Sequence, residues 1–168
     1  MKSISKKIVL VICTAMTFGL SGCATQEQPA PQPVALEDTS VSGLTIIYGS
    51  EPLARSVGFI NAKVYQDGAL KRMSGSIKNL TQATFPVEYQ VTWEDANGAP
   101  LPNSSPWNRV TLNPRAQKAI SSFAKGVGGD HAVVTFKVPA DVEIFVPEPD
   151  PVEVMKYQQE QAMRNAAK

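Results

Sequence analysis

Residues 87–98 read V-E-Y-Q-V-T-W-E-D-A-N-G, and this stretch decides the fold. Apolar and polar side chains alternate without interruption from Val87 to Glu94, which is the pattern of a strand that buries one face. The Asn97-Gly98 dipeptide that follows accepts the positive φ angles of a tight reversal. The stretch therefore predicts a half-buried strand that ends in a hairpin turn.

Similar short patterns lie on both sides of this strand. They predict strands at residues 44–48, 60–65, 73–77, 110–112, 117–124 and 132–138, and turn signals such as Asp67-Gly68 and Asn113-Pro114 separate them. About seven short strands of this kind predict an all-β fold, an immunoglobulin-like antiparallel β-sandwich. No long helical pattern lies between the strands, which argues against a parallel α/β sheet. The expected core is Ile60, Val64, Ile77, Tyr89, Val91, Trp93, Val110, Leu112, Phe123, Val134 and Phe136.

The N-terminus predicts export and a lipid anchor. Three lysines are followed by the apolar residues 8–20 and then by Leu20-Ser21-Gly22-Cys23. A basic start, a short apolar core and small residues before the cut are the parts of a signal peptide, and the core is shorter than the roughly 20 residues that span a bilayer. The last four residues match the lipobox of bacterial lipoproteins, which implies cleavage before Cys23 and acylation of that residue. The alternative is an ordinary signal peptide with a coincidental cysteine.

Cleavage before Cys23 changes the chemistry that the rest of the chain can perform. It removes Cys13 and three lysines, so the formal net charge of +1 becomes negative and no free thiol remains. These changes argue against nucleic-acid binding, a disulfide and cysteine-based catalysis. Ala24, by analogy with lipoprotein sorting signals, directs the protein to the periplasmic face of the outer membrane.

The chain therefore divides into four predicted parts. Residues 1–22 form the signal peptide and signal helix, 23–42 a Pro-rich tether on the lipid anchor, 43–140 the β-sandwich, and 141–168 a tail. The tail is rich in proline at first and then becomes helix-prone, with a thin apolar stripe of Val152, Met155 and Met163. Two readings remain open for it: a frayed tail, or a short helix that orders on a partner.

The central stretch resembles the YcfL family of small bacterial envelope lipoproteins, a domain of unknown function. The resemblance rests on Tyr89, Trp93, Asp95 and Gly98, which form a Tyr-x-x-x-Trp-x-Asp-x-x-Gly pattern, and it extends over about residues 57–138. It implies an immunoglobulin-like envelope lipoprotein that is accessory to cell-wall assembly, and it brings no catalytic residues. The Pro-rich tether and the C-terminal tail depart from the family pattern, so their roles are not carried over.

Three motifs suggest chemistry but lack its other requirements. His131 is the only histidine, and its neighbour Asp130 should point to the opposite face of a strand. Ser122 and Lys125 have the Ser-x-x-Lys spacing of penicillin-binding enzymes, but no Lys-Thr-Gly motif accompanies them. The glycines at 126, 128 and 129 lack the other residues of a phosphate loop. We therefore predict no catalytic residue, no metal site and no cofactor.

Trp107 follows a Pro-Ser loop and is the candidate contact with a partner, although a tryptophan folded over the edge of the sandwich is the simpler reading. The favoured function is a non-enzymatic binding or scaffolding lipoprotein. Its partners are the membrane, through the lipid on Cys23, and another envelope protein, with a glycan as the less favoured alternative to that protein. Two alternatives stay open. One is a structural subunit of an envelope-spanning secretion or pilus assembly, and the other is an envelope enzyme that uses Glu94 and Asp95, which more simply hold a turn.

Overall fold

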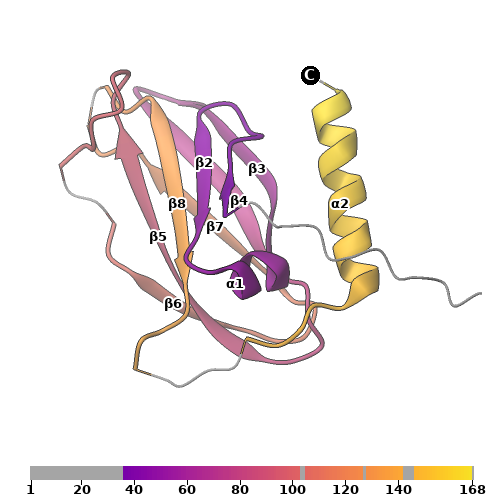
Figure 1. Cartoon of the computed structure of the whole chain (residues 1–168). Coiled ribbons are helices and arrows are strands. Elements are labelled where there is room, and N and C mark those ends of the chain that lie inside the picture. The colour runs from indigo at the N-terminus through magenta and orange to yellow at the C-terminus, as the bar shows by residue number, and fades with distance from the viewer. Residues whose placement is uncertain (1–35, 103–104, 127, 142–145, 168) are drawn as a thin grey trace, which may run out of the picture. The chain divides into compact units, whose positions relative to one another are not determined.

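The computed structural model describes residues 36–102, 105–126, 128–141 and 146–167. Figure 1 shows two β-sheets with a long helix beside one of them. The five-stranded sheet has the order β1 (Glu37–Asp38), β2 (Leu44–Tyr48), β8 (His131–Lys137), β5 (Phe85–Glu94) and β6 (Asn108–Leu112). The three-stranded sheet has the order β3 (Val57–Asp67), β4 (Leu70–Asn79) and β7 (Gln117–Phe123). The predicted all-β sandwich is confirmed.

The strands pair antiparallel with one exception. β2 runs parallel to β8, from the pair Leu44 and Ala132 to the pair Tyr48 and Phe136. Five strands, from both sheets, lie between β2 and β8 in the chain, so no hairpin forces these two neighbours to run in opposite directions. The expectation of a purely antiparallel sandwich therefore fails at this pair.

The core lies between the two sheets and joins side chains from both. Phe59 of β3 and Phe136 of β8 are fully buried, with ring centroids 5.9 Å apart. Trp93 is 4% exposed, and its indole Nε1 donates to the Ser122 hydroxyl at 3.3 Å, so burial leaves this donor satisfied. Most of the predicted core positions are buried or packed against the core cluster.

Phe123 was predicted to lie in the core and is 43% exposed. The register explains the error. Ser122 pairs with the buried Met73 and faces inward, so the next residue, Phe123, pairs with Arg72 and faces outward. The Arg72 guanidinium carbon lies 4.9 Å from the centroid of the Phe123 ring, a cation–π contact that covers part of the exposed ring.

Helix α1 (Glu51–Ser56) is a single short element that the sequence analysis missed. The Ser50 hydroxyl accepts a hydrogen bond from the Leu53 backbone N–H at 3.4 Å, and a proline lies in the first turn. Six residues are too few for a helical period to be visible in the sequence. The buried Leu53 and Ala54 attach this helix to the core.

Of the two readings of the C-terminal segment, the structure shows the helix, α2 (Pro151–Ala166). Its N-cap is Asp150, whose carboxylate accepts a hydrogen bond from the Val152 backbone N–H at 3.0 Å. The helix turns its polar face to the three-stranded sheet, and its apolar residues Val152, Met155 and Met163 are 50%, 53% and 68% exposed. The helix is thus ordered by its own domain. Within the described residues, neither helix has the length and hydropathy to cross a bilayer.

Candidate functional site

The outer face of the three-stranded sheet carries a row of polar side chains on its central strand. In β4, Met73, Gly75 and Ile77 are buried between the sheets, so the alternating residues Arg72, Ser74, Ser76 and Lys78 face outward. Neighbouring strands extend this surface, because Ser121 of β7 pairs with Ser74 and Ala119 pairs with Ser76. The result is a flat face of small polar side chains with a cation at each end of the row.

Gly75 allows the core to pack directly beneath this face. A Cβ atom at Gly75 would overlap the ring of Phe59, which fills the space that any other side chain would need. The glycine is therefore a requirement of core packing. The outer surface that it supports stays flat because its neighbours Ser74 and Ser76 are small.

A β-bulge in β3 shapes one side of the site. The register with β4 shifts between Ile60 and Lys63, and Asn61 adopts a φ of 54°. Asparagine tolerates this left-handed conformation better than most residues. Bulges re-aim side chains, and here the bulge places Lys63 directly opposite Ser74 on the outer face.

Helix α2 forms the other side of the site through two contacts near its N-terminal half. Lys78 Nζ lies 2.7 Å from Glu153 Oε2, and this ion pair is largely buried. The Tyr157 ring lies over Gly58, where an added Cβ would come within 2.9 Å of Cε2. The hydrogen bond from Lys78 holds the pKa of the Glu153 carboxyl below its ordinary value, and Lys156 lowers it further. These contacts set the helix beside the sheet.

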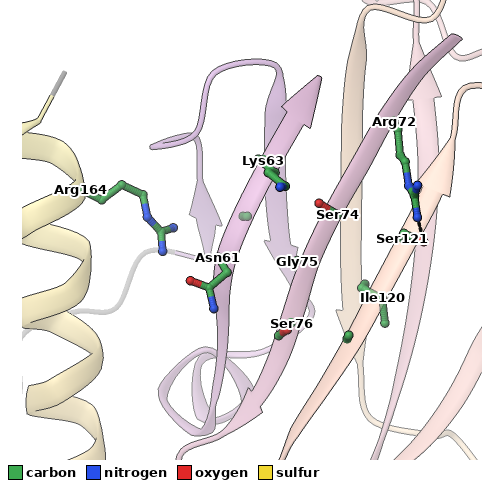
Figure 2. A pocket seen from close by; sticks show the side chains of 11 residues that line it. Asn61, Lys63, Arg72, Ser74, Gly75, Ser76, Ile120, Ser121 and Arg164 are labelled. Atoms are coloured by element: carbon green, nitrogen blue, oxygen red, sulfur yellow. Dashed lines mark hydrogen bonds between the residues drawn. The ribbon is translucent and has the colours of Figure 1, made fainter. Parts of the chain in front are cut away.

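Arg164 projects from α2 toward β3, as Figure 2 shows. Glu153, Tyr157 and Arg164 follow one another at helical spacing on the same face of α2, so the contacts that hold the first two also direct the third. The Arg164 side chain is 22% exposed, and Nη2 lies 3.3 Å from Glu160 Oε1.

Together these elements enclose an open groove of about 770 Å³, which we call the cationic groove. Its polar lining residues are Asn61, Lys63, Arg72, Ser74, Ser76, Ser121 and Arg164. The groove thus brings together three cations and three hydroxyl groups, and none of its described lining residues carries a carboxylate, a thiol or an imidazole. In Figure 2, Arg164 points toward β3, whereas Arg72 lies beside Ser121 of β7 and donates to its hydroxyl at 3.4 Å.

The two arginines of the cationic groove keep unused hydrogen-bond donors. Arg72 pairs with Asp67 at 3.2 Å and Arg164 with Glu160, yet Arg72 Nε and Arg164 Nη1 are buried and have no acceptor among the described residues. Guanidinium groups form their strongest hydrogen bonds with carboxylates and phosphates. The arrangement can therefore hold an anionic group, while it offers neither a nucleophilic thiol nor an imidazole base.

The residues singled out by the sequence lie elsewhere. His131 Nε2 lies 2.8 Å from the Thr45 hydroxyl on the five-stranded sheet, whereas Asp130 pairs with Lys71. The two side chains thus serve different contacts. Ser122 accepts the hydrogen bond from Trp93, and the described residues place no group of three or more potential metal ligands together.

Asp95 holds the hairpin turn after β5. Its Oδ1 accepts hydrogen bonds from the backbone N–H groups of Ala99 at 2.9 Å and Asn97 at 2.8 Å, and these bonds, that of Ala99 foremost, hold the pKa of its carboxyl below the ordinary value. An acid catalyst needs the opposite shift at neutral pH. Glu94, its neighbour, pairs in register with His131 across the sheet.

Trp107 is 39% exposed at the start of β6, and Lys137 Nζ lies 4.0 Å from its ring centroid. The tryptophan therefore packs on the five-stranded sheet, on the opposite side of the sandwich from the cationic groove.

Cys23 and Ala24 lie outside the described residues, as do the signal peptide and most of the tether.

Sequence reasoning missed Lys63, Arg72 and Arg164. A signal for part of the groove was present in the run R-M-S-G-S-I-K at residues 72–78, where each outward position is a cation or a serine. No sequence signal connects this run to Arg164, because only the docking of α2 brings that residue to the sheet.

Comparisons with known proteins identify a family. The model of a family described as "Protein of unknown function (DUF1425)" matches residues 44–137. A crystal structure of a DUF1425 family member from Shewanella sp. pv-4 is similar, with 17% identity, 49% of this chain and 76% of that chain covered, and a TM-score of 0.45. A crystal structure of Campylobacter jejuni cj0090 has 15% identity, covers 56% of this chain and 97% of that chain, and gives a TM-score of 0.44. No curated protein matches at a significant level.

Proposed function

We propose, from the premise that the chain belongs to the DUF1425 family of proteins of unknown function, that it is a non-enzymatic binding module of the bacterial cell envelope. Its ligand is anionic and binds in the cationic groove. The resemblance of Tyr89, Trp93, Asp95 and Gly98 to the YcfL family supports the same class of protein. A lipoprotein of that class binds a partner while its anchor holds it at the membrane.

One observation carries the proposal. The cationic groove gathers Lys63, Arg72 and Arg164, two of which keep buried donors without an acceptor, and its described lining holds no carboxylate. Anionic groups that bind along the groove gain charge-assisted hydrogen bonds from these cations. Binding without chemistry is the function that this set of groups supports.

Inorganic phosphate is the simplest probe of the site. We expect titration of the ¹⁵N-labelled full chain, kept in detergent, to move the backbone amide resonances of residues 61–63, 72–76 and 119–121. The Arg164→Gln variant should weaken this response severalfold, because it removes a donor and a charge but keeps the helix propensity. Higher salt should weaken it as well, since the cations are partly exposed.

Arg55→Gln is the matched control for Arg164→Gln. Arg55 also lies on a helix and also pairs with a glutamate four residues away, Glu51, but it is not part of the cationic groove. An unchanged phosphate response in Arg164→Gln, or an equal loss in Arg55→Gln, would show that phosphate binds to surface cations in general. Either result would remove the proposed function.

The location of the module rests on the N-terminal sequence. Leu20-Ser21-Gly22-Cys23 supports acylation of Cys23, and Ala24 supports the periplasmic face of the outer membrane. We expect Cys23→Ser to release the protein from membranes, and Ala24→Asp to move it to the inner-membrane fraction. Fractionation with an antibody against the chain measures both. Retention of Cys23→Ser in the membrane would contradict the anchor.

A further inference from the structure

The hydroxyl groups of the cationic groove indicate more than a site for a single anion. Ser74 and Ser76 occupy successive outward positions on β4, Ser121 lies beside them on β7, and Asn61 lies at the bulge of β3. A hydroxyl donates one hydrogen bond and accepts others, and the asparagine amide does both. Groups that both donate and accept match the hydroxyl groups of a sugar, which do the same.

The size of the groove also exceeds that of one anionic group. Its volume of about 770 Å³ lies within the range of sites for small organic molecules. From Arg72 to Ser76 the strand advances by roughly 13 Å, at about 3.3 Å per residue. Cations lie at the Arg72 end and on the α2 side, and the serines lie between them. A ligand that contacts all of these groups is extended, with anionic groups spaced along a polar body.

β4 cannot bind an extended peptide by strand addition. Extended peptides usually bind by adding a strand to a sheet edge, where main-chain groups are free. β4 is the central strand and pairs with β3 on one side and β7 on the other, so the ladders on both sides use its main-chain groups. The floor of the cationic groove therefore presents side chains, mainly hydroxyl groups, to its ligand.

From these three features we infer that the ligand is an acidic oligosaccharide, a short sugar chain that carries carboxylate or phosphate groups. This inference rests on the proposed function and names the class of its ligand. The guanidinium groups of Arg72 and Arg164 take the anionic groups, and the hydroxyl groups of Ser74, Ser76 and Ser121 take those of the sugar rings.

The test compares three probes by calorimetry on the full chain in detergent. Trigalacturonate carries both sugar hydroxyls and carboxylates, its methyl ester has the same sugar chain without charge, and triglutamate has the same number of side-chain carboxylates without sugar. We expect trigalacturonate to bind about tenfold or more tightly than either of the others, a difference equal to one or two hydrogen bonds or a charge-assisted pair.

The double variant Ser74→Ala with Ser76→Ala isolates the sugar contacts. It should lower the affinity for trigalacturonate about fivefold or more for each lost hydrogen bond, and the affinity for phosphate by a smaller factor, because the cations remain. Thr111→Ala, which removes an exposed hydroxyl on the five-stranded sheet, is the control and should change neither. Urea unfolding of each variant verifies that the fold is kept.

The outcomes separate this inference from the proposed function. If triglutamate binds as tightly as trigalacturonate, or if the serine variant loses nothing, the oligosaccharide is wrong while an anion site remains. If the methyl ester binds as tightly, the charges do not contribute, and the acidic ligand and the anion site are both wrong. If phosphate binding fails to depend on Arg164, the proposed function itself is wrong. Tighter binding of triglutamate would identify an acidic peptide as the ligand instead.

Discussion

The two outer faces of the sandwich each carry a cluster of cations, and the clusters differ in how they are neutralised. On the five-stranded sheet, Arg109 Nη2 lies 3.0 Å from Glu88 Oε1, Lys137 Nζ lies 3.3 Å from Glu88 Oε2, and Asp141 also pairs with Arg109. In the cationic groove, three cations share the space with serines, and each of the two arginines has one buried donor with no acceptor in the part of the chain that the structure describes.

The register produces this difference. Glu88 lies between Arg109 and Lys137 in one cross-strand row of β6, β5 and β8, so opposite charges are direct neighbours. On β4 the outward row reads Arg72, Ser74, Ser76 and Lys78, and the partners of the serines on β7 are Ser121 and Ala119. Cations that are paired with neighbouring carboxylates have little capacity to bind a further anion. Cations that lie among serines can bind one.

The largest effect should come from a larger side chain at Gly75, in the strand that forms the floor of the cationic groove. Gly75→Val would place a branched side chain where the Phe59 ring lies, and overpacking of this kind costs about 3 kcal/mol. We expect a matching loss in the free energy of unfolding measured with urea, together with the loss of groove binding. Thr111→Val, which places the same side chain at an exposed strand position of the five-stranded sheet, is the control for the added valine. Equal losses in both variants would contradict the packing argument.

A smaller effect should follow from separating α2 from the sheet. Gly58→Val would push the Tyr157 ring outward, because even a Cβ atom comes too close to it, and we expect a loss of about 1–2 kcal/mol. Arg164 then leaves the groove, so phosphate affinity should fall as it does in Arg164→Gln. The row of Glu88, Arg109 and Lys137 should stay intact, and hydrogen exchange of α2 and β5 amides can measure both changes. Normal protection of α2 in this variant would contradict the docking contact.

Acid should loosen the same helix. The pKa of Glu153 lies below its ordinary value of 4.5 because of Lys78, and that of Asp150 lies below 3.8 because of Arg115 and the helix N-terminus. Lowered pKa values mean that the stabilisation is complete above the ordinary values and is lost as the pH falls through the lowered ones. We therefore expect protease sensitivity of α2 to rise below about pH 4. Glu153→Gln should make this dependence shallower, and an unchanged pH profile would argue against the ion pair.

The smallest effect should come from a change in the ion pairs of Glu88 on the five-stranded sheet. Glu88→Gln removes the central charge from between Arg109 and Lys137, but all three groups border water, where ion pairs contribute little. We expect a marginal shift of the urea midpoint and no change in phosphate or trigalacturonate binding. A loss of binding equal to that in Arg164→Gln would show that the two faces are not functionally different.

The strands could be predicted from the sequence because apolar and polar side chains alternate, with a period of two residues, along a half-buried strand. Val87 to Glu94 shows that pattern, and β5 has these bounds within two residues. Helix α1 has too few residues to show a helical period. The prediction for Phe123 was wrong because an apolar residue in a partly polar strand does not show which face of the strand is buried. The sequence also did not indicate that Asn79 is buried. Its side-chain amide donates to the backbone carbonyl groups of Ala83, Leu112 and Asn113, which only the folded chain brings together.

The candidate site was largely beyond sequence reasoning. The alternation of residues 72–78 was visible, but the outward direction of the serines depends on the register with β3 and β7. Helix α2 reverses the usual expectation, because its polar face packs inward and Val152, Met155 and Met163 face water. Its position follows from Lys78 and Gly58, which are 75 and 99 residues away from Glu153 and Tyr157 in the chain.

By itself, the sequence determined the class of the fold, the hairpin turns and the prediction of a lipid anchor at Cys23, because these depend on neighbours within a few residues. The tertiary structure decided which face of β4 meets water, which side of α2 meets the sheet, and therefore that Lys63, Arg72 and Arg164 share one groove. The physical reason is that a site made of side chains from a bulge, a central strand and a distant helix exists only once the core has set their relative positions.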